Sequence, residues 1–476
     1  MYLIFDTETT GLPQNWKAPL SDFENWPRLV QLAWQVHDIR GDLIEVKNYI
    51  VKPESYDIPY NVSKIHGITT ERAHREGITL TEVLENFVKS LKKVKYIAGH
   101  NVSFDKNIVG CEFLRKKMTN YLQSMRSIDT KEEATDYCNI PGGRGGKFKW
   151  PSLTELHEKL FGDKFAEAHN ALADVEATAR CFLELIRLEI IPFSRVDMNF
   201  KQFQKYQELN PKPFKRIGLN VEPYKPLQET DKQEKDVKKE TETNISKKSK
   251  SHFAHLHLHS QYSVLQATPD ISSLVQKAVN ENMPAIALTD HSNMFGSFKF
   301  IDEVLKHPVN NDLHDGEKLK LKPILGCELN VCKNHKDKSR QDNGGKIPFL
   351  AKNKNGYHNL SMLSSLGYLK GFYYVPRIDK ELIQEYKENL IVLSGSLYGT
   401  IPNLIVNVGE QQAEEEFKWW HKQFGNDFYV EINKHGIDEE EYINKILIKF
   451  AKKYSVKILA SNNVYYYRFN EHILYT

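Results

Sequence analysis

Residues 2–11 are YLIFDTETTG, and this stretch decides the fold of the first part of the chain. Its apolar run from Tyr2 to Phe5 is typical of a central strand that is buried on both faces. Asp6 and Glu8 follow, two positions apart. Because side chains alternate across a strand, both carboxylates would lie on one face. The stretch therefore predicts a buried strand that ends in a pair of acids.

The segments that follow this strand alternate between strand and helix patterns. In chain order the sequence predicts a hairpin of strands 29–36 and 43–51 turning at 40–42, a helix around 83–91, a strand at 96–98 followed by a helix, and a last helix at 171–188. Meander strands followed by α/β units predict a mixed sheet with helices on its faces.

Two further acids, Asp105 and Asp174, stand just after the strand at 96–98 and at the entry to the last helix. Taken alone, an Asp-x-Glu pair at a strand end is more often solvated than functional, and Asp105 alone could be a helix N-terminal acid. If the fold gathers them with Asp6 and Glu8, their mutual repulsion raises their pKa values and favours bound cations. Hard oxygen ligands suit Mg²⁺ or Mn²⁺, and two such ions can support phosphodiester hydrolysis.

Three motifs carry a family resemblance, namely FDTETTG at 5–11, HNVSFD at 100–105 and HNALAD at 169–174. They resemble the three motifs of the DEDDh exonucleases, and the similarity to proofreading subunits of bacterial replicative polymerases extends over about residues 1–190. The resemblance implies an RNase H-like fold, two Mg²⁺ or Mn²⁺ ions and 3′→5′ release of nucleoside monophosphates.

The same resemblance assigns roles to single residues. It implies metal ligands at Asp6, Glu8, Asp105 and Asp174 and a general base at His169, whose residue type has a pKa of about 6.5, near operating pH. It implies substrate contacts from Thr7, Thr9, Leu12, His66, Asn101 and Phe104, with Leu12 wedged under the terminal base. For Leu12 and His66, ordinary loop packing is the alternative.

A second cluster of polar residues begins at FAHLHLHS, residues 253–260, where histidines alternate with apolar residues. On a strand these histidines would face one way, toward a metal. Further strands are expected at 254–259, 285–290, 322–328, 390–394, 428–432 and 456–460. Several of them end in polar residues, and barrels of parallel strands carry their chemistry at those ends, so a barrel-like domain is predicted.

From about His252 onward the sequence resembles the PHP domain that begins DNA polymerase III alpha subunits. The resemblance rests on FAHLHLHSQYSVLQ, PAIALTDHSNMFG, KPILGCEL, GYHNL, GFYYVPRID, VLSGSLYG and FYVEINKHG. PHP domains are barrel phosphoesterases with a cluster of metals, so the resemblance implies a distorted β/α barrel. The metal-ligand pattern is kept at His257, His259, His291, Glu328 and His358.

Four positions depart from that pattern. Gln266 replaces an Asp, Ser396 a Cys, Asn463 an Asp and Tyr465 a His. Since these are poor replacements for anionic or imidazole ligands, we expect a weak or inactive scaffold that holds at most one Zn²⁺ or Mn²⁺ ion, at reduced occupancy. The alternatives are an active PHP phosphoesterase, or a chain that is mainly an assembly module of the replicase.

Composition agrees with two folded domains joined by a linker. The chain has 476 residues, of which 40% are hydrophobic, so we expect about two to three domains and exclude wholesale disorder. Residues 228–251 are charged and poor in apolar side chains, which predicts a flexible linker. The predicted organisation is exonuclease at 1–190, an extension at 191–227, the linker, and the PHP domain at 252–476.

The remaining features limit the setting. No run of about 18 apolar residues and no basic N-terminal region occur, so neither a membrane helix nor a signal peptide is expected. Five cysteines do not make a disulfide framework and fit a reducing cytoplasm. The net charge of +3 neither requires nor excludes nucleic acid.

An alpha subunit continues beyond its PHP domain into polymerase domains, and no polymerase aspartates can be assigned here. The sequence is then either a fragment of a longer DNA-directed DNA polymerase or a shortened reading frame. The expected activity is a metal-dependent 3′→5′ DNA exonuclease. Its expected partners are a DNA 3′ end, single-stranded or frayed, together with the polymerase domains of the parent chain and other replicase subunits.

Overall fold

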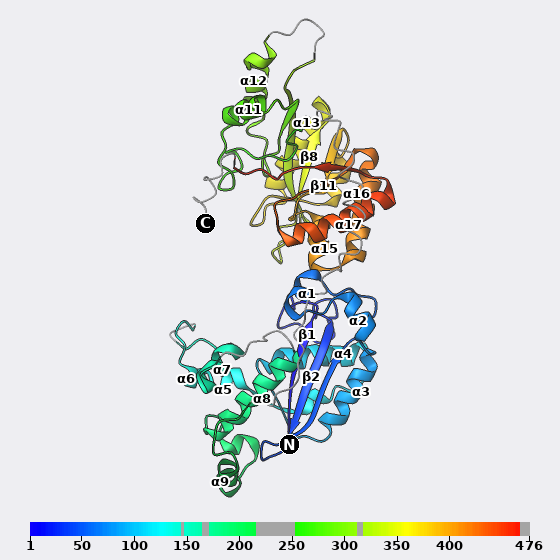
Figure 1. Cartoon of the computed structure of the whole chain (residues 1–476). Coiled ribbons are helices and arrows are strands. Elements are labelled where there is room, and N and C mark those ends of the chain that lie inside the picture. Colours follow the sequence, from blue (N-terminus) through cyan, green and yellow to red (C-terminus); the bar gives the residue numbers. More distant parts are fainter. Residues whose placement is uncertain (144–146, 164–170, 216–252, 312–317, 467–476) are drawn as a thin grey trace, which may run out of the picture. The chain divides into compact units, whose positions relative to one another are not determined.

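The structure is a computed structural model that describes residues 1–143, 147–163, 171–215, 253–311 and 318–466 (Figure 1). His169 and the predicted linker at 228–251 lie outside the described residues. The chain divides into two compact units, residues 1–230 and 231–476, and each is described by itself. Among the described residues, none of the helices has both the length and the apolar character needed to cross a bilayer.

The first unit is built on a five-stranded sheet with the order β3-β2-β1-β4-β5. Its strands are β1 (Tyr2–Thr9), β2 (Leu29–His37), β3 (Leu43–Ile50), β4 (Tyr96–Gly99) and β5 (Arg126–Asp129). β1, β2 and β3 are antiparallel neighbours, whereas β1, β4 and β5 run parallel. This is the mixed sheet that the sequence predicts.

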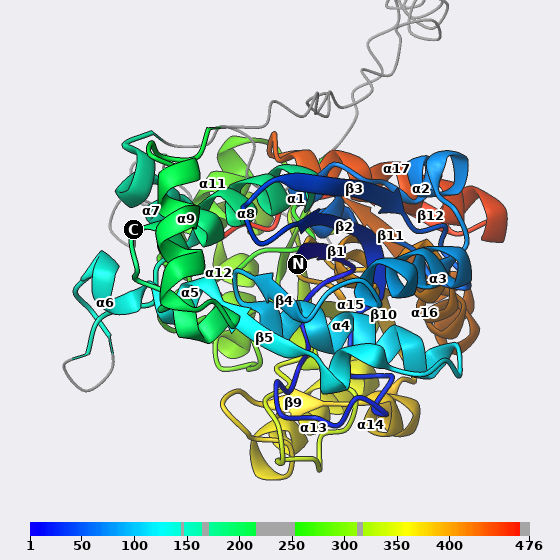
Figure 2. The ribbon, with the colours of Figure 1, turned by 90° about the horizontal axis from the view of Figure 1, so that it is seen from below.

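Helices cover both faces of this sheet (Figure 2). α8 (Ala171–Arg187) and α9 (Phe200–Leu209) pack with Tyr2 and Ile4 on one face. α3 (Leu80–Leu91) and α4 (Val102–Arg115) pack with the intervening residues of β1 on the other. The alternation continues to the end of β1, so Asp6 and Glu8 point to the α8 side and Thr7 to the α4 side.

The other helices of this unit are short. They are α1 (Tyr60–His66), α2 (Thr70–Glu76), the 3₁₀ turn η1 (Tyr121–Ser124), α5 (Thr130–Glu133), α6 (Thr135–Cys138), α7 (Leu153–Phe161) and the 3₁₀ turn η3 (Phe193–Val196). α9 falls in the predicted extension, and its Phe203 and Tyr206 are buried in the core beneath α8. The Tyr206 hydroxyl donates to the Leu183 carbonyl at 2.9 Å, which fixes α9 to α8.

The second unit contains a curled sheet with the order β12-β11-β10-β8-β7-β6, with β9 paired to β7. Its strands are β6 (Ala285–Leu288), β7 (Lys322–Val331), β8 (Gly345–Ala351), β9 (Arg377–Ile378), β10 (Leu390–Leu393), β11 (Phe428–Ile432) and β12 (Lys457–Ala460). β8, which is absent from the predicted strands, is antiparallel to β7 and β10 and so distorts the predicted β/α barrel. The short connection before β8 contains no crossover helix among the described residues, so the chain turns back on itself.

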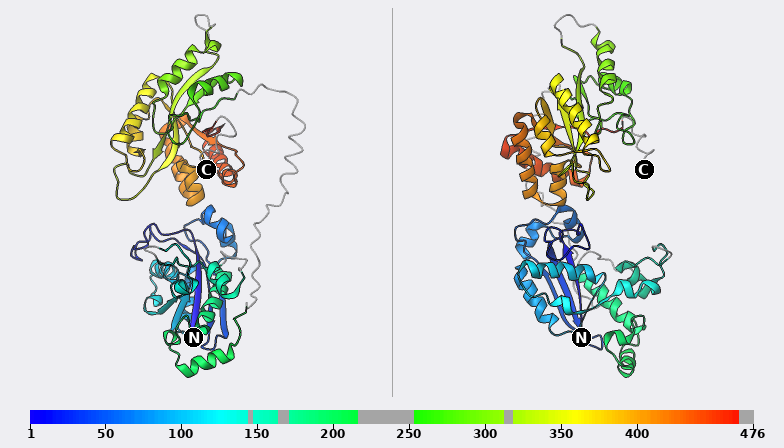
Figure 3. Two further views of the ribbon diagram at one scale, coloured as in Figure 1. Left: turned by 90° about the vertical axis from the view of Figure 1, so that its left-hand side faces the viewer. Right: turned by 180° about the vertical axis from the view of Figure 1, so that it is seen from behind.

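Figure 3 shows the helices of this unit, green to orange, around the outside of the sheet. They are α11 (Ile271–Asn280), α12 (Ser297–Lys306), α13 (Lys354–Leu369), α14 (Lys380–Tyr386), α15 (Thr400–Asn407), α16 (Glu410–Phe424) and α17 (Asp438–Tyr454), with 3₁₀ turns η4 (Pro308–Asn310) and η5 (Gly425–Asp427).

The predicted strand at 254–259 is not a regular strand. It forms two isolated bridges, His255 with Ile286 of β6 and Leu258 with Val464, which follows β12. The Thr289 hydroxyl lies 2.9 Å from the Leu258 nitrogen and 3.0 Å from its oxygen, and so takes the place of a continuous ladder. The segment nevertheless joins the two ends of the curled sheet, as the predicted barrel requires.

Candidate functional site

The first unit gathers three carboxylates at the end of β1. One oxygen from each of Asp6, Glu8 and Asp174 lies within 4.8 Å of the other two. Asp6 and Glu8 come from the α8 face of β1, and Asp174 lies in the first turn of α8. Strand alternation and one helix start therefore bring together acids that are 168 residues apart in the sequence (174 − 6).

The fourth predicted acid, Asp105, is held on the other side of the strand. It lies buried in the first turn of α4, and its Oδ1 accepts hydrogen bonds from the Thr7 amide at 3.0 Å and the Thr7 hydroxyl at 2.6 Å. Thr7, which lies between Asp6 and Glu8 on β1, thus fixes the position of the Asp105 side chain.

Burial and mutual repulsion favour the protonated form of these acids. The pKa of Asp6 is raised well above its usual range by burial and by Asp105, Asp174 and Glu8. Burial, with Asp174 and Asp105, raises the pKa of Glu8 to about 8. Burial raises the pKa of Asp105 to about 7 although the Thr7 hydrogen bonds oppose it. Such an all-oxygen cluster fits hard divalent cations, which would offset the repulsion.

A cation and an exposed aromatic ring lie at the start of α4, the helix that carries Asp105. Asn101 stands before α4 with a left-handed backbone (φ 74°), and its side-chain oxygen accepts from the Lys131 ammonium at 2.5 Å. That ammonium lies 4.2 Å from the ring centroid of Trp150, which is 59% exposed. The His100 Nε2–H donates to the Pro151 carbonyl at 3.0 Å and so anchors the Trp150 loop.

The loop after β1 carries the other predicted substrate residues. The Thr9 hydroxyl donates to the Gly11 carbonyl at 2.7 Å, and Gly11 has φ 149°, which favours glycine. Leu12 follows and is 71% exposed. His66 is only 5% exposed, and burial lowers its pKa to about 4 although the backbone of Thr9 opposes the shift. The His66 ring therefore lies against the backbone of Thr9 in its neutral form.

Phe104 contributes to a second exposed aromatic surface. Its ring lies 5.6 Å from that of Trp16, which is 53% exposed. The first unit thus leaves Leu12, Trp16 and Trp150, three large apolar groups, open to solvent.

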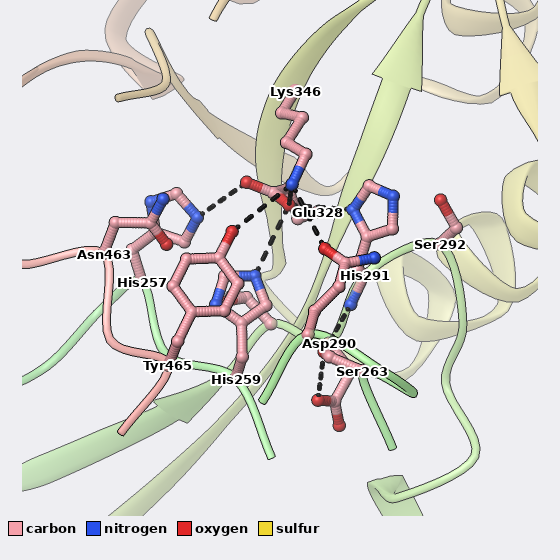
Figure 4. Close-up of polar contacts among 12 residues, drawn as sticks. His257, His259, Ser263, Asp290, His291, Ser292, Glu328, Lys346, Asn463 and Tyr465 are labelled. Carbon is pink, nitrogen blue, oxygen red and sulfur yellow. Dashed lines mark hydrogen bonds and ion pairs between the residues drawn. The ribbon is translucent and has the colours of Figure 1, made fainter. Parts of the chain in front are cut away.

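The second unit has its own cluster, in which nitrogen donors surround one carboxylate (Figure 4). His257, His259 and Glu328 are fully buried, with their ligand atoms within 4.8 Å of one another. Glu328 lies 3.0 Å from His257 Nε2, 2.8 Å from His291 Nδ1 and 3.4 Å from His259 Nε2. On its other side, His257 Nδ1 lies 2.9 Å from a second buried carboxylate, Glu431.

These contacts set the charges of the cluster. Burial alone would lower the pKa of His257, but Glu431 and Glu328 raise it to about 10. Burial would raise the pKa of Glu328, but the hydrogen bonds from the three histidines hold it well below its usual range. Burial lowers the pKa of His259, so the buried charge pairing of the cluster is that of His257 with Glu328 and Glu431.

Two family models match the chain, one to each unit. The model described as "Exonuclease" matches residues 3–182, and the model described as "PHP domain" matches residues 255–435. The chain joins an exonuclease domain to a PHP domain.

Relatives of the chain are DNA polymerase III alpha subunits. That of Borreliella burgdorferi is 42% identical over 221 residues, which are 46% of this chain and 18% of the relative. That of Treponema pallidum is 36% identical over 219 residues, 45% of this chain and 18% of the relative. The chain thus spans less than a fifth of the length of the curated relatives it matches. Among solved structures, E. coli exonuclease I in complex with a dA16 oligonucleotide matches with a TM-score of 0.33 and 23% identity, covering 43% of this chain and 45% of that one.

The structure brings together most of the site residues named from the sequence, but not all. Asp6, Glu8 and Asp174 meet in the exonuclease domain, and His257, His259, His291 and Glu328 meet in the PHP domain. His358 is not placed with them, because it lies on an exposed part of α13 and its ring contacts Tyr357. His169 and Asn170 lie outside the described residues.

Sequence reading missed four residues that shape the two sites. Glu431 and Lys346 belong to the PHP cluster, and Lys131 and Trp150 lie beside Asn101 at the start of α4. Glu431 could have been suspected, since an acid within the apolar strand FYVEI must be buried with a partner. For Lys346, Lys131 and Trp150 the sequence offers no spacing that would have identified them.

Proposed function

We propose that the exonuclease domain is a metal-dependent 3′→5′ exonuclease on DNA and that the PHP domain is a scaffold without hydrolytic activity. The observation that carries the proposal is the meeting of Asp6, Glu8 and Asp174 within 4.8 Å. Repulsion among these partly buried carboxylates makes the cluster unfavourable without cations, which supports a metal-binding role.

In this proposal Asp6, Glu8, Asp105 and Asp174 hold two Mg²⁺ or Mn²⁺ ions. When bound, such ions stabilise the attacking and leaving oxygens of a phosphodiester. Thr7 keeps Asp105 oriented through its two hydrogen bonds. His169 removes the proton from the attacking water, and a nucleoside monophosphate is released.

The substrate would lie along the exposed apolar groups. Leu12 wedges under the terminal base, Thr9 and Phe104 line its site, and Asn101 contacts the strand beside the Lys131 ammonium. His66 acts through the backbone of Thr9, because its own side chain is buried.

The setting we propose is proofreading within a bacterial replicase. Similarity to DNA polymerase III alpha subunits supports a parent polymerase whose other domains and subunits are the partners of this chain. A frayed or single-stranded primer end is the proposed substrate. Since all five cysteines are free and buried, we place this activity in a reducing cytoplasm.

The test uses 3′-labelled single-stranded DNA and a mismatched duplex with Mg²⁺. We expect monomer release from the full chain and a loss of about 10²–10⁴-fold in both Asp6→Ala and His169→Ala. Asp42→Ala, which removes an exposed acid from the β2–β3 turn, should keep full activity. Equal activity in all variants, or monomer release from 5′ ends first, would refute the proposal.

A further inference from the structure

The ammonium group of Lys346 lies near Glu328, the central carboxylate of the PHP cluster (Figure 4). It stands near the start of β8, and its backbone pairs with Asn330 of β7 in an antiparallel register. Glu328 is two residues away on β7, so Lys346 and Glu328 are diagonal neighbours on one face of the sheet. The sheet itself therefore directs the ammonium group toward the central carboxylate.

Oxygen atoms and aromatic rings surround this ammonium group. Lys346 Nζ lies 3.7 Å from Glu328 Oε2, 3.2 Å from Gln266 Oε1 and 3.4 Å from the Tyr465 hydroxyl. It also lies 5.7 Å and 5.9 Å from the ring centroids of Tyr465 and Tyr398. An ammonium has three N–H donors and is attracted to aromatic faces, so these groups suit it.

Two of these partners stand at positions where the sequence departs from the metal-binding PHP pattern. Gln266 and Tyr465 replace an acid and a histidine, and both now offer a neutral oxygen to Lys346. The ring of His259 stacks on Tyr465 at 4.2 Å, which holds the phenol over the cluster. The other two departures pair with each other, since Asn463 Nδ2 donates to Ser396 Oγ at 3.1 Å.

We infer that the Lys346 ammonium is the resident cation of the PHP centre and takes the place of a bound metal. Glu328 receives its counter-charge from within the protein, and Gln266 and Tyr465 are ammonium ligands rather than degraded metal ligands. The donor set present therefore does not fit a metal cluster, because a divalent ion at Glu328 would stand against a fixed positive charge. This charge is the physical cause of the reduced Zn²⁺ or Mn²⁺ occupancy expected from the sequence.

The test measures Zn²⁺ binding to the full chain, with Asp6→Asn present throughout to disable the exonuclease site. After dialysis against Zn²⁺ alone, the parent chain should bind no Zn²⁺ at the PHP centre. Lys346→Ala and Lys346→Met should each bind one further Zn²⁺ per chain under the same dialysis, because the opposing positive charge is gone. Lys346→Met keeps the side-chain length, so it remains informative if the alanine variant folds poorly.

Two controls separate the charge of Lys346 from its bulk. Lys346→Arg keeps a cation and should stay free of Zn²⁺. Lys352→Ala removes an exposed lysine next to β8 that pairs with Asp427 at 2.7 Å, and it should behave as the parent. A Zn²⁺ ion at the PHP centre of the parent, or no gain in Lys346→Ala and Lys346→Met, would overturn the inference. Neither outcome depends on exonuclease activity, so the proposed function is tested separately.

Discussion

The two clusters are built from similar ligands but differ in how their charge is balanced. In the exonuclease domain, the groups that shift the pKa of Asp6, apart from burial itself, are three other carboxylates. In the PHP domain, the carboxylate of Glu328 faces three histidines and the Lys346 ammonium. In our two proposals, the first cluster therefore takes its cations from solution, whereas the second contains its own.

They also differ in access. Asp6, Glu8 and Asp174 of the exonuclease domain are partly exposed, and the same domain leaves Leu12, Trp16 and Trp150 open to solvent. His257, His259 and Glu328 are fully buried, and Tyr465 stacks over them. A set of potential metal ligands thus indicates catalysis only where counter-charge is lacking and a substrate can approach.

The largest effect that we expect comes from removing the internal charge balance of the PHP cluster, and it is an effect on the stability of that domain. Glu328→Gln removes the fully buried carboxylate that faces His257, His259 and His291, so the PHP domain should lose about 3–5 kcal/mol of unfolding free energy. Urea unfolding of the full chain measures the stability of the PHP domain, and a separate nuclease assay measures the exonuclease domain. Activity on DNA should be unchanged.

Asp427→Asn is the matched control for Glu328→Gln, because it removes an acid from an exposed pair with Lys352. Its effect should be at most about 0.5 kcal/mol. If Glu328→Gln proves as mild as this control, the PHP cluster does not depend on its internal charges.

His66, one of the buried histidines of the exonuclease domain, gives the next effect, which depends on pH. Burial lowers the pKa of His66 to about 4, so the unfolded chain binds the proton first as pH falls. Its contribution to stability is complete above about pH 6.5 and is lost between about pH 6.5 and 4, by about 3 kcal/mol in total. Urea unfolding across this range should show a steeper loss for the parent chain than for His66→Gln. If the unfolding free energies of the two chains fall in parallel with pH, protonation of His66 does not destabilise the folded domain.

Much of the exonuclease fold could be predicted because its patterns are local. The alternation in YLIFDTET placed Asp6 and Glu8 on one face of β1, and the hairpin and α8 followed from turn residues and helical spacing. The pairing of Thr7 with Asp105 could not be predicted, because it joins residues 98 positions apart through the register of β1 and α4.

The PHP domain was harder to predict because its key contacts cross the sheet. β8 begins with Gly345 and Lys346 and contains Pro348, three residue types that are uncommon within strands. Its sequence, GKIPFLA, therefore did not resemble the other strands. Without β8, Lys346 could not be placed beside Glu328, nor Gln266 be understood as its partner 80 positions away. The family motifs showed that metal ligands of the PHP pattern are missing at Gln266 and Tyr465. They gave no information on the contacts that these two residues make with Lys346 instead.

Cations from solution provide a smaller and more direct test of the contrast. Mg²⁺ at about 100 times its dissociation constant should stabilise the exonuclease domain by about 2.7 kcal/mol, since it binds only the folded cluster. Asp6→Asn should remove that gain. The unfolding of the PHP domain should not respond to Mg²⁺ in either chain. Calorimetry of the full chain would contradict the contrast if Mg²⁺ shifted both domains equally.

The smallest expected effect concerns access to the exonuclease cluster. Stacking of a base on an exposed aromatic ring contributes about 1–3 kcal/mol, so Trp150→Ala should weaken binding of a labelled oligonucleotide by about tenfold. Fluorescence anisotropy at fixed salt, with Asp6→Asn present to prevent cleavage, measures this. Trp419→Ala is a matched control, because Lys380 lies 4.5 Å from the Trp419 ring in the PHP domain much as Lys131 lies over Trp150. If both variants lose the same affinity, the DNA does not bind the exonuclease domain in preference to the PHP domain. A loss confined to Trp150→Ala would place the strand along the loop that His100 anchors.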